Sequence, residues 1–446
     1  MWNATLLHTI TDASHFTYAA QSKKYAQLGA DRLIVTARGD CGGGLNCSTH
    51  GHQSFGAAVS LVQSSTGSPF ARIVDSWSNA SYALEGQDVD DDGKHLVVAD
   101  LMQGRLLSFN TSCLKCGPRH ELKLSTNSAL HVRIYRARTG RQFALVTTGF
   151  ASRQSWRGEK MAPWAADVET AKQPISVAAA ARGARRISGG LVAVELVADG
   201  HMVEVDSLTD HEGVPKGTEG VLVQGDYAYL GGALDTALVQ VSLSGLDDAA
   251  ATAQLRISGR WRSPVYVQMV GASLTHAPNT LAFALWGWLG GIATFRATHG
   301  GGGSTAVGGP AEEEDAGAAG RTSTGAPQLV EQGRFTKLRL ARANRVHMAG
   351  VHAWLPLEQE PGAIAAINLS DVTRPTVALE PVPLRLAPAA ADGDEDGAAQ
   401  RRPKTTCYCM AVHEDLAFAF AAPSAALLVY RIGNSGRRHE GGVHES

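Results

Sequence analysis

Short runs of alternating apolar and polar residues recur along this chain, and each run follows a turn. Residues 225–243 read Gly-Asp-Tyr-Ala-Tyr-Leu, a polar gap and Ala-Leu-Val-Gln-Val-Ser-Leu, and residues 350–369 and 414–432 repeat the plan. Alternation with a period of two is typical of half-buried antiparallel strands. Similar pairs of runs occupy four further segments, 31–62, 92–109, 140–196 and 279–295. Seven such units are too small to bury their own faces, so they must pack on one another.

This repetition predicts an all-β fold, a single β-propeller spanning residues 1–446 with seven blades of four-stranded antiparallel sheet. After Ile432 only a polar tail remains (433–446), so the last unit lacks an outer strand. The run from Ala4 to Ile10 has the pattern of an outer strand. We therefore expect the N-terminal strand to complete the last blade, which leaves no open edge between the first and last blades.

Three segments interrupt the repeats. Residues 299–328 and 387–406 have no apolar periodicity and are rich in small and charged residues, so we expect disordered loop expansions. A partner-binding role for them is the alternative to inert insertions. Residues 152–188 form a third insertion, and Trp156 and Trp164 suggest that it packs over one face of the disc.

Composition excludes some partners. Charged residues make up 18% of the chain and the formal net charge is −2, so no electrostatic argument supports a nucleic-acid partner. The longest apolar stretch, 280–295, contains three glycines and is too short for a transmembrane segment. A protein or glycan partner is the expectation that remains. The oligomeric state is not determined by the sequence.

Two features indicate an oxidising, lumenal or extracellular compartment. The six cysteines are even in number. Five asparagines open Asn-X-Ser/Thr acceptors for N-glycosylation, where chance would give roughly one: Asn3, Asn46, Asn79, Asn110 and Asn368. The first residues show neither a basic nor an apolar signal region. Either the signal peptide is missing from this chain, which we favour, or the Asn-X-Ser/Thr acceptors are coincidental.

The Gly-Asp-Tyr-Ala-Tyr units and the run Ala-Ile-Asn-Leu-Ser-Asp-Val-Thr-Arg-Pro (366–375) resemble LVIVD-repeat β-propellers. The resemblance covers two or three of the seven units, and their second halves depart from the family pattern. It implies a propeller fold and cell-surface or secreted placement, and it transfers no active-site residue. Residues 88–100 also resemble the repeats of lactonase-type and integrin-like propellers.

Asp88, Asp90 and Asp92 have the Asp-X-Asp-X-Asp-Gly spacing that collects oxygen ligands around Ca²⁺. The twelfth position of such a loop would be Ala99, where an EF-hand needs a bidentate glutamate. The alternative, which we favour, is a hairpin turn at Asp92-Gly93 with the remaining acids in solvent. Calcium is the one cofactor that the sequence suggests, and otherwise none is expected.

Cysteine and histidine residues form two local groups. Cys41, Cys47, His50 and His52 lie within twelve residues and offer donors for zinc or copper. A Cys41–Cys47 disulfide is the preferred alternative to that metal site. Cys113 and Cys116 form a Cys-X-X-Cys, for which a structural disulfide is favoured over a redox centre. Cys407 and Cys409 lie on a predicted innermost strand, and their partners cannot be derived from spacing.

No nucleophile elbow, phosphate loop or zinc-protease helix is present in the sequence. Four histidines fall at or near predicted strand starts, where propeller active sites place ligands around the central channel: His131, His276, His352 and His413. The first functional hypothesis is a non-catalytic secreted or cell-surface scaffold that binds a protein or glycan. The alternative is a metal-assisted channel-site hydrolase of lactonase type, and a copper or zinc oxidoreductase at residues 41–52 is a third.

Overall fold

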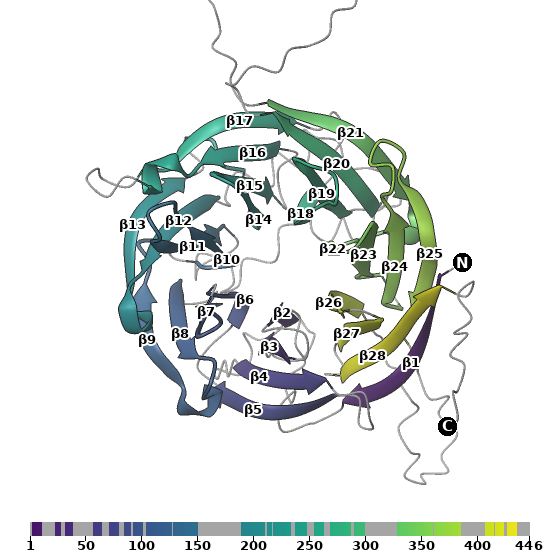
Figure 1. Cartoon of the computed structure of the whole chain (residues 1–446), viewed down its shortest axis with the longest axis horizontal. Coiled ribbons are helices and arrows are strands. Elements are labelled where there is room, and N and C mark those ends of the chain that lie inside the picture. Colours follow the sequence, from purple (N-terminus) through teal and green to yellow (C-terminus); the bar gives the residue numbers. More distant parts are fainter. Residues whose placement is uncertain are drawn as a thin grey trace, which may run out of the picture.

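The computed structural model describes twenty-one segments of the chain. These are residues 2–10, 23–27, 32–38, 57–64, 71–79, 84–90, 92–100, 104–126, 128–149, 189–209, 212–215, 217–232, 237–247, 254–262, 268–286, 290–298, 328–359, 361–384, 406–413, 415–422 and 426–434. Within them the chain folds into seven four-stranded antiparallel sheets. The sheets surround a central axis like the blades of a propeller (Figure 1).

Blades are numbered along the chain, and each is given from its innermost to its outermost strand. Blade 1 is β2 (Lys23–Gln27), β3 (Arg32–Arg38), β4 (Ala57–Ser64) and β5 (Ala71–Asn79). Blade 2 is β6 (Leu84–Val89), β7 (His95–Asp100), β8 (Arg105–Asn110) and β9 (Pro118–Lys123). Blade 3 is β10 (Val132–Arg136), β11 (Gln142–Thr148), β12 (Gly190–Leu196) and β13 (Met202–Thr209). Blade 4 is β14 (Thr218–Gln224), β15 (Tyr227–Gly232), β16 (Ala237–Ser242) and β17 (Arg256–Arg262).

The remaining blades follow the same order. Blade 5 is β18 (Gln268–Leu274), β19 (Thr280–Trp286), β20 (Gly290–Thr298) and β21 (Gln328–Lys337). Blade 6 is β22 (His347–Ala349), β23 (His352–Leu357), β24 (Ala363–Asn368) and β25 (Thr376–Pro383). Blade 7 is β26 (Thr406–His413), β27 (Leu416–Ala422), β28 (Ala426–Asn434) and β1 (Trp2–Ile10). Four short 3₁₀ turns complete the described elements: η2 (Leu114–Cys116), η4 (Ala198–Gly200), η6 (Ser244–Leu246) and η7 (Leu338–Leu340).

The first strand of the chain closes the ring, as the sequence predicted. β1 pairs antiparallel with β28, from Trp2 opposite Asn434 to Ile10 opposite Leu427. Blade 7 therefore takes its outermost strand from one end of the chain and its other three from the opposite end. In Figure 1 β1 lies at the rim beside β28 and next to β5 of blade 1.

Glycine explains the turn before the second strand in blades 2, 4 and 6. Gly93, Gly225 and Gly350 lie between the first and second strands of their blades and have φ values of 69°, 54° and 58°. L-residues rarely adopt this left-handed region, which glycine enters without steric cost. In blade 4 the carbonyl oxygen of Asp226, the residue after Gly225, accepts a hydrogen bond from Leu243 at 2.8 Å. The hydrogen bond at this Gly-Asp turn therefore ties the start of β15 to the end of β16.

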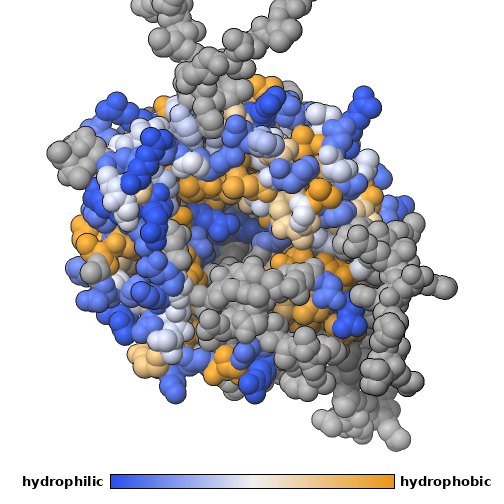
Figure 2. All heavy atoms as spheres, viewed as in Figure 1, coloured by the Kyte–Doolittle hydropathy of each residue, from blue (hydrophilic) through white to orange (hydrophobic). Residues whose placement is uncertain are grey.

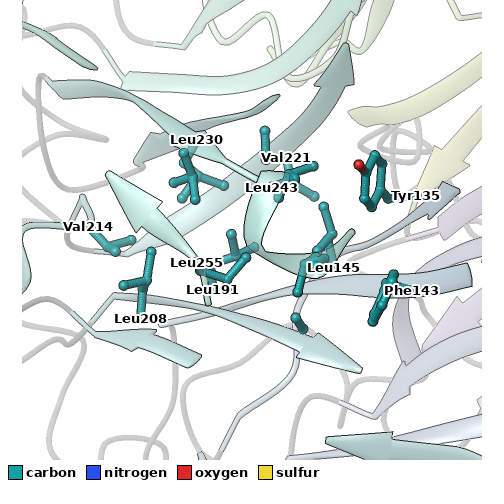
Figure 3. Packing of buried hydrophobic residues seen from close by; sticks show 14 of the residues in the cluster. Tyr135, Phe143, Leu145, Leu191, Leu208, Val214, Val221, Leu230, Leu243 and Leu255 are labelled. Atoms are coloured by element: carbon teal, nitrogen blue, oxygen red, sulfur yellow. The ribbon is translucent and has the colours of Figure 1, made fainter. Parts of the chain in front are cut away.

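Apolar residues of neighbouring blades pack together in the seams. Between blades 3 and 4, Phe143, Leu145 and Leu191 pack with residues of blade 4 such as Val221 and Leu230 (Figure 3). Similar clusters join blades 1 and 2, 2 and 3, 4 and 5, 5 and 6, and 6 and 7. Each fully buried side chain of this size contributes about 1.5–3 kcal/mol. Seam packing is therefore the main force that holds the disc together.

Several sequence expectations fall outside the described residues or at their edges. Insertion 152–188 lies outside them, and so do 299–328 and 387–406 except for their last residues, which begin β21 and β26. β28 continues to Asn434, two residues into the expected polar tail. The described chain includes no helix with the length and apolarity to cross a membrane.

Candidate functional site

The innermost strands define two ends of the disc. We name the end at which they begin the start face, and the other the end face. Because consecutive strands are antiparallel, second strands finish at the start face. Contacts between blades agree with this placement. Thr36, near the end of β3, donates to the carbonyl oxygen of Glu85 in β6 at 3.4 Å, and Thr147 of β11 donates to that of Glu219 in β14 at 3.1 Å.

Three polar side chains from three blades meet in the centre of the start face. His131 precedes β10, Glu219 is the second residue of β14, and Arg345 precedes β22. Arg345 Nη2 lies 2.7 Å from His131 Nε2, while Glu219 Oε1 is 3.7 Å from Arg345 Nη2 and 3.8 Å from His131 Nε2. Blades 3 and 6 are not neighbours, so the contact crosses the axis. Viewed along this axis, the disc has a central hollow with hydrophilic residues in its depth (Figure 2).

Local backbone features aim these side chains at the axis. The register of β14 against β15 shifts between Thr218 and Gly220, so Glu219 lies in a β-bulge, and bulges redirect side chains. Thr147 joins the two blades at this point. Its hydroxyl accepts a hydrogen bond from the His131 N–H at 3.1 Å and donates to the Glu219 carbonyl at 3.1 Å. The main chains under His131 and Glu219 are therefore held at a fixed separation.

The charges of the cluster compensate one another. A guanidinium always donates, so His131 Nε2 accepts from Arg345 and the imidazole is neutral with its proton on Nδ1. Glu219 supplies the negative charge opposite Arg345. The side chains of Arg345, His131 and Glu219 are 13%, 10% and 18% exposed. The cluster can bind a polar group at the channel mouth. However, His131 Nε2, the ring nitrogen that would act as a general base, already accepts a hydrogen bond from Arg345.

The other histidines named from the sequence lie elsewhere. His276 is exposed in the turn between β18 and β19, His352 begins β23, and His413 ends β26. Burial lowers the pKa of His352. His347 of the innermost strand β22 was not singled out from the sequence. It is half-buried by surface exposure, and desolvation lowers its pKa to about 3. It is therefore uncharged at physiological pH.

The predicted calcium ligands have other contacts. Asp90 accepts from the N–H of Lys94 at 2.7 Å, and Asp88 accepts from that of Ile134 in blade 3 at 2.9 Å. The exposed Asp92 lies 3.4 Å from an arginine nitrogen, and Gly93 forms the expected turn. Among the described residues, no three His, Cys, Asp or Glu side chains are grouped to hold a metal ion. The hairpin turn of the alternative is present, but Asp88 and Asp90 are not in solvent as that alternative expected, because Asp90 is buried and both accept main-chain hydrogen bonds. A calcium site there stays a prediction.

Some of the cysteines named from the sequence lie within the described residues and others lie outside them. Cys41, Cys47, His50 and His52 lie outside the described residues. Cys113 and Cys116 form a disulfide with an S–S distance of 2.09 Å around η2. Asp75 of blade 1 accepts a hydrogen bond from the N–H of Leu114 at 2.6 Å, which holds this loop against the neighbouring blade. Cys407 is buried on the innermost strand β26, where the sequence placed it.

Two of the five glycosylation acceptors coincide with a structural turn. Asn110 and Asn368 end the third strands of blades 2 and 6, and each side-chain oxygen accepts the N–H of the serine two residues on at 2.9 Å. This is an Asx-turn. Blade 4 has Ser242 there, which accepts the N–H of Ser244 at 3.4 Å. The turn explains why an asparagine stands at these positions, but it needs only a main-chain N–H two residues on and so does not explain the serine.

The remaining acceptors are placed less completely. Asn79 is exposed at the end of β5 on the start face, and Asn3 lies on β1. Asn46 lies outside the described residues. Glycosylation at any of them stays a prediction.

Sequence reasoning missed Glu219 and Arg345. Both lie seven or eight positions before a strand anchor that was recognised, Tyr227 or His352. Alignment of the innermost strands would have placed these two charged residues near corresponding positions of blades 4 and 6. It would not have shown that blades 3 and 6 meet across the axis.

Comparison with solved structures bears on the architecture alone. No protein-family model matches the sequence, and no curated protein matches it significantly. The β-propeller domain of Cps50 (Swd1) from Myceliophteria thermophila has a TM-score of 0.54 at 10% identity, covering 96% of this chain and 99% of that chain. The fold is a β-propeller. A protein from Lactobacillus plantarum gives a TM-score of 0.49 at 10% identity, over 81% of this chain and 84% of that one. At this identity the likeness to Cps50 concerns the fold alone.

Proposed function

We propose that the protein is a non-catalytic binding or scaffold propeller of the cell surface or secretory pathway, with a protein or glycan partner. The observation that carries the proposal is the contact between Arg345 and His131 at 2.7 Å. It links opposite walls of the channel and occupies the imidazole nitrogen that a general base would need. The guanidinium of Arg345 and the carboxylate of Glu219 at the channel mouth are groups that can form hydrogen bonds with a partner.

The alternative, a metal-assisted hydrolase, conflicts with the same contact. A divalent ion at this cluster would take His131 or Glu219 as ligands. The Arg345 guanidinium already lies within 4 Å of both, at 2.7 and 3.7 Å. Two positive charges at such a distance repel each other strongly in a partly buried site. Metal-dependent chemistry here would first require Arg345 to move away.

The compartment is part of the proposal. The disulfide between Cys113 and Cys116 supports an oxidising environment. Asn110 and Asn368 also serve a turn, and glycosylation of the five acceptors is part of the proposal. The resemblance of the Gly-Asp-Tyr units to LVIVD repeats agrees with surface or secreted placement and remains part of the proposal.

The test uses the full chain, secreted from eukaryotic cells with an added signal peptide. Lactonase and esterase activity is measured with and without added Ca²⁺ or Zn²⁺, and binding is measured on a glycan array and on live cells. We expect no turnover, together with saturable binding that Arg345→Ala weakens and the exposed-site variant Arg339→Ala does not. Turnover that disappears in a folded His131→Ala or Glu219→Gln variant would refute the scaffold proposal and support the hydrolase.

A further inference from the structure

A group of histidines lies in the seam between blades 2 and 3, away from the cluster of His131, Glu219 and Arg345 in the channel. Ser108 of β8 lies opposite Val97 of β7 on one side and opposite His120 of β9 on the other. His95 lies opposite Asn110 and two residues before Val97, so the side chains of His95, Ser108 and His120 share one face of blade 2. Val97 packs with Val146 and Val192 of blade 3, so this face is turned toward blade 3. The hairpin at η4 then brings His201 of blade 3 against it.

The seam contains polar atoms with no internal partner. His95 Nδ1 and Ser108 Oγ are buried and make no hydrogen bond in the described structure. Both face the same point of the hairpin: a Cβ added to Gly200 would lie 2.8 Å from His95 Nδ1 and 2.7 Å from Ser108 Oγ. Buried polar atoms are usually satisfied by protein, water or an ion. This part of the seam is therefore suited to a polar ligand rather than to apolar packing.

The two imidazoles at the edge of this seam have the spacing of metal ligands. The ring centres of His120 and His201 are 5.1 Å apart, with an interplanar angle of 65°. Two imidazoles on one tetrahedral zinc ion, with Zn–N bonds of about 2.0–2.1 Å, place their ring centres about 5 Å apart. His120 is half-buried and His201 is exposed, so an ion can reach them from solvent.

We propose that His120 and His201 bind a transition-metal ion of the zinc, copper or nickel type across the seam between blades 2 and 3. Imidazole nitrogen is a preferred donor for these ions. The described residues hold no preformed group of three metal-binding side chains, so water fills the other positions on the ion. Because the two ligands come from different blades, a bound ion joins β9 to the hairpin before β13.

The experiment uses the full chain with His50→Ala and His52→Ala, which removes the other histidines that the sequence offers to a metal. Binding of ZnCl₂ and NiCl₂ is measured by isothermal titration calorimetry in this background, in His120→Ala and His201→Ala, and in the matched control His276→Ala. We expect one metal ion per chain to bind to the His50→Ala, His52→Ala background and to its control variant His276→Ala. Binding to the seam variants His120→Ala and His201→Ala should be at least tenfold weaker.

Two further readouts separate binding from a general loss of structure. Zinc should raise the unfolding temperature of the background and the control but not of the seam variants, because a ligand of the native state stabilises it by mass action. Affinity should fall from pH 7.5 to pH 5.5, because only neutral imidazole binds the ion. His201→Gln, which keeps a polar side chain, should behave like His201→Ala. Unchanged affinity in both seam variants, or no binding in the background, would overturn the proposal.

Discussion

Gly86 of blade 2 lies directly against the main chain of His131 in blade 3. A Cβ at Gly86 would come 2.4 Å from His131 Cα and 2.4 Å from the carbonyl oxygen of Leu130. Real Cβ atoms essentially never approach other atoms so closely, so only glycine fits. The missing side chain in β6 therefore sets how closely blade 2 approaches the residue that carries the channel imidazole.

The first prediction follows from this contact. Gly86→Ala should lower the free energy of unfolding by about 1–3 kcal/mol or more, because overpacking forces the two main chains apart. Urea denaturation measures the change. Gly225→Asn is the control: nothing lies within 4 Å of its Cβ position, and its φ of 54° is one that asparagine tolerates. An effect of Gly86→Ala no larger than that of the control would contradict the steric argument.

The ion pair at the channel mouth should show energetic coupling. Arg345 and Glu219 lie 3.7 Å apart and are both mostly buried, so removing either leaves a charge that its partner no longer balances. We expect a double-mutant cycle of Arg345→Ala and Glu219→Ala to give a coupling energy of about 1–3 kcal/mol. The exposed pair Arg339 and Glu380, 3.5 Å apart, is the control and should give less than about 1 kcal/mol. Equal coupling in the two cycles would show that the channel pair has no special role.

Acidification should destabilise the propeller partly through His347. Burial lowers its pKa from 6.5 to about 3. Between these values the unfolded chain binds a proton that the folded chain does not, so stability falls as the pH drops from about 6.5 toward 3. We expect His347→Gln to lose less stability than the parent between pH 7 and pH 5, measured by thermal unfolding. The exposed His276→Gln should follow the parent curve, and identical curves for all three proteins would reject the assignment.

The Asx-turns give a prediction that separates structure from glycosylation. In protein made in bacteria, where no N-glycan is attached, Asn368→Ala should still cost about 0.5–1.5 kcal/mol, because the Ser370 N–H loses its acceptor. Asn368→Asp keeps that acceptor and should be nearly neutral. Asn110 in blade 2 should behave the same way with Ser112. Equal stability of the Ala and Asp variants would show that the turn does not explain these asparagines.

The architecture could be predicted from the sequence because it depends on local signals. Period-two alternation located the second strand of every blade, with glycine turns marking several of them, and the pattern at Ala4–Ile10 identified the closing strand. The channel cluster could not be predicted in this way. Glu219 and Arg345 are single charged residues at or just before the start of innermost strands, and their meeting with His131 depends on how blades 3, 4 and 6 are arranged around the axis.

The calcium site predicted at Asp88, Asp90 and Asp92 shows a different limitation of prediction from sequence. The spacing of Asp88, Asp90 and Asp92 suits an ion, but the same residues suit a hairpin, in which Asp90 caps the turn through Lys94. One-dimensional spacing does not distinguish side chains that converge from side chains that bind separate main-chain donors. Asp88 in fact reaches a different blade, through Ile134.

The pairing of β1 with β28 also has a consequence for biosynthesis. Trp2 leaves the ribosome long before Asn434, its partner in the sheet, has been made. Until then the nascent chain exposes one unpaired strand at its start and an uncovered blade at its growing end. Ring closure therefore has to wait until β28 has been made. Factors that shield exposed strand edges would act on this chain mainly in the interval between its first blade and its last.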